Sequence, residues 1–255
     1  MVLEICVDSV EAAIVAAKGG ADRIELCSDL LEGGITPSAG LLSAVRAAVS
    51  IDLFAMIRPR GGDSLYSARE MEVMEADIAE AKRLGANGVV LGVLDSDGQV
   101  DVPRTERLVK LAAPMEVTFH RAFDMTPDLE QACEDAIAAG AHRILTSGGR
   151  QTARLGAGQI ARLVERAGWR IGVVAASGID PRNAADLISG TGVTELHASL
   201  RRRAPSPVKY RKHGVTMGGR KNAEFVRYRL IEADVRALRC AVDTAVATVG
   251  AGRSV

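Results

Sequence analysis

The sequence predicts a (β/α)8 TIM barrel, an α/β fold in which residues 1–255 form a single domain. A helix-ending glycine followed by an apolar strand occurs four times, in residues 19–28, 85–92, 140–147 and 192–199. Glycine ends helices because it adopts the left-handed conformation at little cost. The spacing of these units, roughly 50 to 65 residues, leaves room for another strand and helix between each pair, and such barrels have about 250 residues. An open doubly wound sheet is the alternative, but no G-x-G-x-x-G follows the first strand.

The elements follow in strict strand–helix alternation, which favours parallel pairing. Strands are expected near residues 3–7, 24–27, 53–58, 88–93, 116–120, 143–147, 170–175 and 195–199. Helices are expected near residues 9–18, after Pro37, at 68–84, after Pro103, at 127–139 and at 222–249. Residues 201–220 are rich in Arg, Lys, Pro and Gly, and we expect a long basic loop before the last helix.

Composition narrows the possible partners. The 32 basic and 32 acidic residues give a formal net charge of +0, and aromatic residues make up 3% of the chain. Neither value favours nucleic acid or an anionic membrane as partner. Without a basic-then-apolar leader or an apolar run of about 18 residues, we expect a cytoplasmic protein with no membrane segment. The four cysteines are then expected to be free thiols.

Alternation of apolar and polar residues along the strands predicts that the barrel interior is polar near the carboxyl-terminal ends of the strands. Leu3, Ile5 and Val7 suit the outer side under the helices, so Glu4 and Cys6 should point inward. The same logic directs inward Asp8, Glu25, Cys27, Met56, Arg58, Arg60, Thr118, His120, Glu195, His197 and Ser199. The acidic members could pair with Arg58 and Arg60. So many ionisable groups at strand ends favour a functional site over a buried structural network.

Two cysteines suggest a soft-metal site. Cys6 and Cys27 each follow a glutamate by two positions on neighbouring strands, which would bring the thiols together. Thiolates suit Cu(I), and His197 on the last strand, which adjoins the first in a closed barrel, could add an imidazole. In the alternative interpretation, both cysteines are small buried hydrophobes.

Acid–base chemistry is a second possibility. His120 ends the fifth strand, and Asp124 could orient its imidazole or an arginine. Arg58 and Arg60 could hold a carboxylate or phosphate, with Glu25 or Glu4 as the partner acid or base. Glu195 is a further catalytic candidate. The same residues could instead form a network that only fills the barrel.

Two glycine turns could bind an anion. Ser147, Gly148 and Gly149 follow the sixth strand, and Ser177 and Gly178 follow the seventh, near the usual phosphate position of this fold. Ordinary turns that need glycine are the alternative. The basic run from residue 201 to 212 resembles a nucleic-acid patch in isolation, but zero net charge favours a solvated loop, a lid or an oligomer contact.

Several long motifs resemble the CutC family over nearly the whole chain. They are EICVDS at 4–9, GADRIELCS at 20–28, EGGITPS at 32–38, MIRPRGGD at 56–63, TFHRAFD at 118–124, ILTSGG at 144–149 and ELHAS at 195–199. The resemblance implies a TIM-barrel cytoplasmic protein of copper homeostasis that forms homo-oligomers. The leading hypothesis is therefore Cu(I) binding through thiols at the barrel mouth. The alternative is a metal-independent isomerase, lyase or hydrolase that acts on a small anionic or sugar-phosphate-like molecule.

Overall fold

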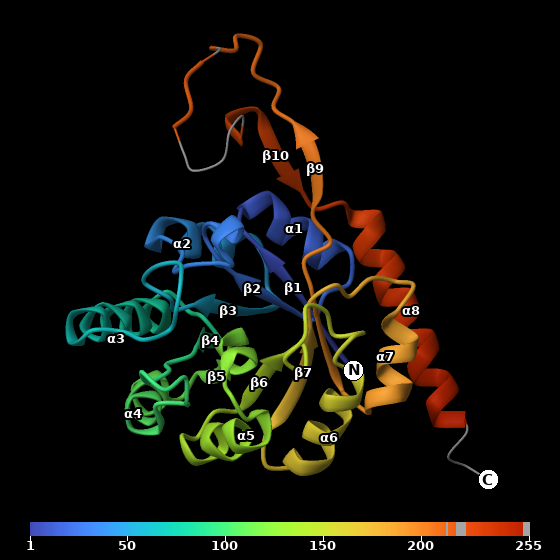
Figure 1. Cartoon of the computed structure of the whole chain (residues 1–255). Helices are drawn as coiled ribbons and strands as arrows, with labels where there is room; N and C mark the ends of the chain where they lie inside the picture. Colours follow the sequence, from blue (N-terminus) through green and yellow to red (C-terminus); the bar gives the residue numbers. More distant parts are fainter. Residues whose placement is uncertain (213, 218–222, 252–255) are drawn as a thin grey trace.

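Eight parallel strands form a closed barrel in the computed structural model, which describes residues 1–212, 214–217 and 223–251 (Figure 1). The strands are β1 (Val2–Val7), β2 (Arg23–Leu26), β3 (Asp52–Met56), β4 (Gly88–Leu91), β5 (Glu116–Phe119), β6 (Arg143–Thr146), β7 (Gly172–Ala176) and β8 (Glu195–Ala198). The helices around them are α1 (Val10–Lys18), α2 (Ala39–Ala48), α3 (Ala68–Arg83), α4 (Val102–Ala112), α5 (Leu129–Ala138), α6 (Ala157–Ala167), α7 (Ala184–Thr191) and α8 (Glu232–Ala251). The predicted single-domain (β/α)8 barrel is confirmed.

The outer face of the strands forms the main core. Leu3, Ile5 and Val7 are completely buried beneath the helices, as their alternation predicts. Burying each such side chain contributes about 1.5–3 kcal/mol relative to exposure. This apolar layer determines which residues of every strand must face the barrel interior.

Strand register brings chemically distinct residues to the same level inside the barrel. Glu4 of β1 pairs with Arg23 on β2 and with His197 on β8, and Cys6 lies opposite Glu25. Because side chains alternate between faces, these paired residues all point to the same side of the sheet. The pairing of β1 with β8 thus joins the first and last strands of the barrel at the site.

Local sequence chemistry explains where the helices begin. The hydroxyl of Ser9 accepts from the backbone N–H of Ala12 at the start of α1. At the start of α3, Ser67 and Glu70 form a reciprocal capping box.

Among the described residues, no helix combines the length and apolar character needed to cross a bilayer.

The segment expected as a basic loop at 201–220 is partly a β-hairpin. β9 (Arg202–Pro205) pairs antiparallel with β10 (Val226–Arg229), after the short 3-10 helix η3 (Ala223–Phe225). This arm projects away from the barrel, and α8 begins at Glu232 instead of 222 (Figure 1). The hairpin escapes pattern analysis because its residues are basic and largely exposed, with no apolar alternation. His213 lies outside the described residues.

Candidate functional site

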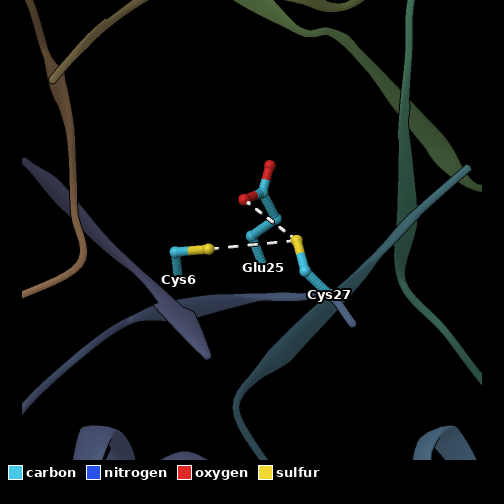
Figure 2. Close-up of side chains that lie close together, drawn as sticks. All are labelled: Cys6, Glu25 and Cys27. Atoms are coloured by element: carbon cyan, nitrogen blue, oxygen red, sulfur yellow. Dashed lines mark hydrogen bonds between the residues drawn. The ribbon is translucent and has the colours of Figure 1, made fainter. Parts of the chain in front are cut away.

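Two thiols and a carboxyl group meet inside the barrel. Cys6 comes from β1, Glu25 from β2, and Cys27 follows β2 directly; all three are buried. The Sγ atoms of the two cysteines lie 3.9 Å apart, and the Cys27 thiol donates to Glu25 Oε2 at 3.5 Å (Figure 2). One ligand atom from each residue lies within 4.8 Å of the others. The predicted proximity of Cys6 and Cys27 is confirmed.

His197 extends this cluster from β8. Its Nδ1 lies 2.6 Å from Glu4 Oε1, and its Nε2 lies 3.9 Å from Glu25 Oε2. Glu4, Glu25 and His197 form a second group whose ligand atoms lie within 4.8 Å of one another. Because Glu25 belongs to both groups, the thiols and the imidazole form one continuous polar centre.

The protonation states of this centre differ from those of free side chains. The hydrogen-bond contact with Cys27, opposed by burial and aided by His197, lowers the pKa of Cys6 to about 5. The bond to Cys6, together with burial, raises the pKa of Cys27 well above 9.0. Burial and the nearby Cys6 charge likewise raise the pKa of Glu25. The result is one thiolate beside one thiol at neutral pH.

His197 is cationic in this environment. Burial alone would lower its pKa, but the negative charge of Glu25 and bonds to Cys6 and Glu4 raise it well above 6.5. For Glu4, burial opposes ionisation, yet the His197 hydrogen bond and the Arg23 charge lower its pKa to about 2. An imidazolium and a carboxylate therefore lie beside the Cys6 thiolate.

An ion-pair layer lies beneath the cluster. Arg23 Nε donates to Glu4 Oε2 at 2.5 Å, and its terminal nitrogen donates to Glu195. Arg143 bonds to Glu195 at 3.1 Å and to Glu116 at 2.5 Å. Both guanidinium groups also stack on the Phe54 ring, at 4.8 and 5.3 Å from its centroid.

Glu195 is therefore not a residue of the barrel mouth, contrary to expectation. Its Cα is level with Val2, the first residue of β1, so the side chain lies at the amino-terminal end of the barrel. The arginines that neutralise the interior glutamates are Arg23 and Arg143, instead of Arg58 and Arg60. The alternation of residues in β2 does indicate Arg23, because it lies two positions before Glu25 and its side chain therefore points to the same inner side of the barrel.

A cavity of about 700 Å³ opens above the thiol cluster. Cys6, Glu25 and His197 contribute to its lining, whereas Cys27 does not. The walls also include Arg58, His120, Arg121, Ser177, Gly178 and Arg201. The structure thus brings predicted residues from six strands to one space.

His120 has an incomplete set of hydrogen bonds. Its Nδ1 accepts from the backbone N–H of Ala122 at 3.1 Å, and its Nε2 has no partner among the described residues. Burial, with the nearby Arg58 charge, lowers the pKa of His120 to about 4. The ring is therefore neutral near pH 7, with its proton on Nε2.

The two arginines expected to hold an anion already have other partners. Arg58 lies at the cavity wall but donates to the carbonyls of Glu32, Gly34 and Gly62 at 2.7–2.9 Å. Arg60 pairs with Glu70 and Asp63 and is absent from the cavity lining. Arg58 therefore supplies charge to the cavity wall, and Arg60 stabilises the loop that follows β3.

Asp124 occupies the place expected for an anion after β6. Its carboxylate accepts from the backbone N–H of Ser147 at 2.9 Å and of Gly149 at 3.0 Å, while Gly148 N donates to Thr146. It also holds Arg121, at 2.9 Å, and does not contact His120 in any described bond. The turn of Ser147, Gly148 and Gly149 thus has an internal carboxylate, and an external phosphate would have to displace it.

Comparison with known proteins agrees with this architecture. The family model described as "CutC family" matches residues 1–202. The chain belongs to the CutC family. A CutC family protein from Chromobacterium violaceum is 50% identical over 244 residues, covering 96% of this chain and 99% of that protein. The copper homeostasis protein cutC homolog of Homo sapiens is 48% identical over 237 residues, covering 93% of this chain and 86% of that protein.

Solved structures give the same result. A CutC crystal structure from Streptococcus agalactiae superposes with a TM-score of 0.74 and 31% identity, covering 77% of this chain and 97% of that chain. A thiamine phosphate pyrophosphorylase from Pyrococcus furiosus has a TM-score of 0.59 at 17% identity and covers 96% of each chain. The first likeness supports the CutC assignment, and the second shows only a shared barrel fold.

Proposed function

We propose that this chain is a cytoplasmic copper homeostasis protein that binds Cu(I) through Cys6 and Cys27, with His197 as an additional ligand. The observation that carries the proposal is the pair of buried thiols 3.9 Å apart. Metal–thiolate bonds are about 2.3 Å long for a comparable d10 ion, so both sulfurs can reach one ion. The copper homeostasis proteins among the relatives support the choice of metal.

The surroundings of the thiols match a soft monovalent cation. Cys6 is already a thiolate, so Cys27 is the one sulfur ligand that must lose a proton when the ion binds, and the His197 imidazolium must lose one before its Nε2 can coordinate. Phe54, Met56 and Val90 pack around the two sulfurs and exclude water from one side. Soft sulfur ligands in an apolar shell favour Cu(I) over oxygen-preferring ions.

The carboxyl group of Glu25 also fits a metal-binding role. Its Oε1 is buried and lacks a hydrogen-bond partner within the described chain. The group could accept the proton that Cys27 releases or approach the ion itself. His197 is oriented by Glu4 through Nδ1, an arrangement typical of metal-binding histidines, and its Nε2 faces Glu25.

Anaerobic titration against a strong Cu(I) chelator tests this proposal. We expect the Cys6→Ala/Cys27→Ala double variant to lose at least about 100-fold in affinity, and His197→Gln to lose about tenfold. Cys240→Ala is the matched control, because Cys240 is an exposed thiol on α8. Unchanged affinity in the double variant would show that the thiol pair does not bind copper.

The proposal includes self-association through the arm. Exposed apolar side chains cluster in the segment between β9 and β10, namely Val208, Tyr210, Val215 and Met217. Apolar groups so exposed on a projecting hairpin are typical of contact surfaces. Light scattering should give a smaller mass for Tyr210→Ser/Met217→Ser than for the unchanged chain. A monomeric unchanged chain would contradict this part of the proposal.

A further inference from the structure

The cavity above the thiol cluster is much larger than a bound ion requires. Its volume of about 700 Å³ falls within the usual range of small-molecule sites, about 300–1,000 Å³. We propose that it binds a small organic oxyanion, a carboxylate or phosphate ester, through His120 and Arg201. This site adjoins the proposed copper ligands Cys6 and His197, and neither of its two donors is a copper ligand.

His120 supplies a hydrogen-bond donor that has no acceptor. Its Nδ1 accepts from Ala122 N, so the neutral ring carries its proton on Nε2. The side chain is 6% exposed, lines the cavity, and Nε2 is unpartnered in the part of the chain described. A buried donor without an acceptor is unfavourable. A ligand oxygen in the cavity would satisfy it.

The backbone of β4 leaves room for this arrangement. Gly92 follows β4, and a Cβ there would lie 2.6 Å from the imidazole ring of His120. Any side chain at this position would force the ring to move. The glycine therefore keeps His120 in its place beside the cavity.

Arg201 supplies a second unsatisfied donor from another part of the barrel. It follows β8, whereas His120 follows β5, so the two come from well-separated strands of the closed ring. Its Nε is buried and unpartnered within the described residues, while its Nη1 forms an ion pair with Asp8 at 3.3 Å. Stacking over Tyr228 at 5.2 Å keeps the guanidinium group in place at the base of the arm.

Arg58 gives its part of the cavity wall a positive charge that favours an anion over a neutral ligand, whereas the Cys6 thiolate and Glu25 line the part beside the thiol cluster. Arg58 lines the cavity, and its guanidinium nitrogens contact backbone carbonyls, with no carboxylate at ion-pair distance among the described residues. Asp63 also lines the cavity, but Arg60 pairs with it at 3.0 Å. The positive charge of Arg58 thus remains uncompensated next to the two free donors.

Calorimetric titration of the reduced, metal-free protein tests this inference with probes that share a three-carbon frame. The probes are glycerol 3-phosphate, glycerate and neutral glycerol. We expect one of the two anions to bind and glycerol not to bind. The preferred anion identifies the ligand as a phosphate ester or a carboxylate. Absence of binding by both anions up to 10 mM, or equal binding of glycerol, would overturn the proposal.

Matched variants connect any binding to the named donors. His120→Leu and Arg201→Met should each weaken binding at least tenfold, which corresponds to about 1.4 kcal/mol. His120→Gln keeps an N–H donor and should retain affinity within about threefold. Arg203→Met is the control, because Arg203 is exposed on β9, two residues after Arg201, and lies outside the cavity lining. Equal affinity in all four variants would show that the anion binds elsewhere.

The copper experiment separates the two proposals. Cys27→Ala should bind the anionic probe as the unchanged chain does, because Cys27 belongs to the thiol pair but does not line the cavity. Conversely, Arg201→Met should leave Cu(I) affinity unchanged. Loss of both activities in either variant would contradict the independence of the two sites.

Discussion

Replacing Arg23 with methionine tests whether the buried ion-pair layer stabilises the barrel. The Arg23 side chain is 3% exposed and lies between Glu4, at 2.5 Å, and Glu195. Removal of the guanidinium group leaves two interior carboxylates with one partner each, His197 and Arg143. Breaking a buried ion pair in this way costs about 3–5 kcal/mol, because a charge remains without its partner.

The expected loss can be converted to a melting temperature. An unfolding entropy of about 2.1 cal/mol/K per residue gives about 0.5 kcal/mol/K for this chain, so Tm should fall by about 6–10 °C. Urea unfolding monitored by circular dichroism gives the free energy directly. Arg69→Met is the control, because the Arg69 side chain is 89% exposed and, among the described residues, its ion-pair partner is Glu72 alone. That change should cost less than about 1 kcal/mol.

The pH dependence of the Arg23→Met effect provides a second criterion. Without Arg23 the pKa of Glu4 should rise, because its carboxylate loses an attractive positive charge. Protonation at pH 5 then relieves part of the unfavourable charge, so the destabilisation should be smaller at pH 5 than at pH 8. A loss below about 1 kcal/mol that does not vary with pH would refute the reasoning.

Three further predictions concern the same region. Ionisation of Cys6 should give an absorbance change near 240 nm with a midpoint near pH 5. The change should be absent in Cys6→Ser and retained in the control Cys133→Ser. A midpoint above pH 8 would contradict a lowered Cys6 pKa. The pKa of Glu4 is lowered from 4.5 to about 2, so stability that is present above pH 4.5 should be lost as pH falls towards 2. The lost stability amounts to about 3 kcal/mol, and an unchanged acid limb in Glu4→Gln would count against this assignment. Gly92→Ala should lower the free energy of unfolding by about 1–3 kcal/mol, because the added Cβ forces the His120 ring to move. Gly158→Ala is the control, because its Cβ would meet free space, and it should be neutral or stabilising. Equal effects of the two changes would argue against close packing at Gly92.

The alternation of residues in β1, β2 and β8 was enough to predict the core of the site. Glu4, Cys6, Glu25, Cys27 and His197 were all expected inside the barrel, and all lie there. The reason is that the outer side of each strand must be apolar, because it packs under the helices. Polar residues of a strand are therefore confined to its inward-facing positions. The metal and anion roles of these residues remain predictions.

Height along the barrel axis could not be predicted in the same way. The side chains of Glu195 and His197 both point inward. Glu195 comes two residues earlier in β8, however, so it lies nearer the amino-terminal end of the barrel, where it pairs with Arg23 and Arg143. That level depends on the stagger between neighbouring strands, which alternation within one strand does not specify. Arg58 and Arg60 also lie beyond the end of β3, where the two-residue period no longer applies.

The sequence by itself determined the barrel, the inward phase of its strands and the proximity of the two thiols, because hydrophobic alternation and glycine-ended helices are local properties. Only the tertiary structure decided which charges pair. It showed that Asp124 fills the turn after β6, and that His120 and Arg201 retain unpartnered donors. Hydrogen-bond partners so far apart in the chain depend on strand stagger and loop conformation, which form only when the barrel closes.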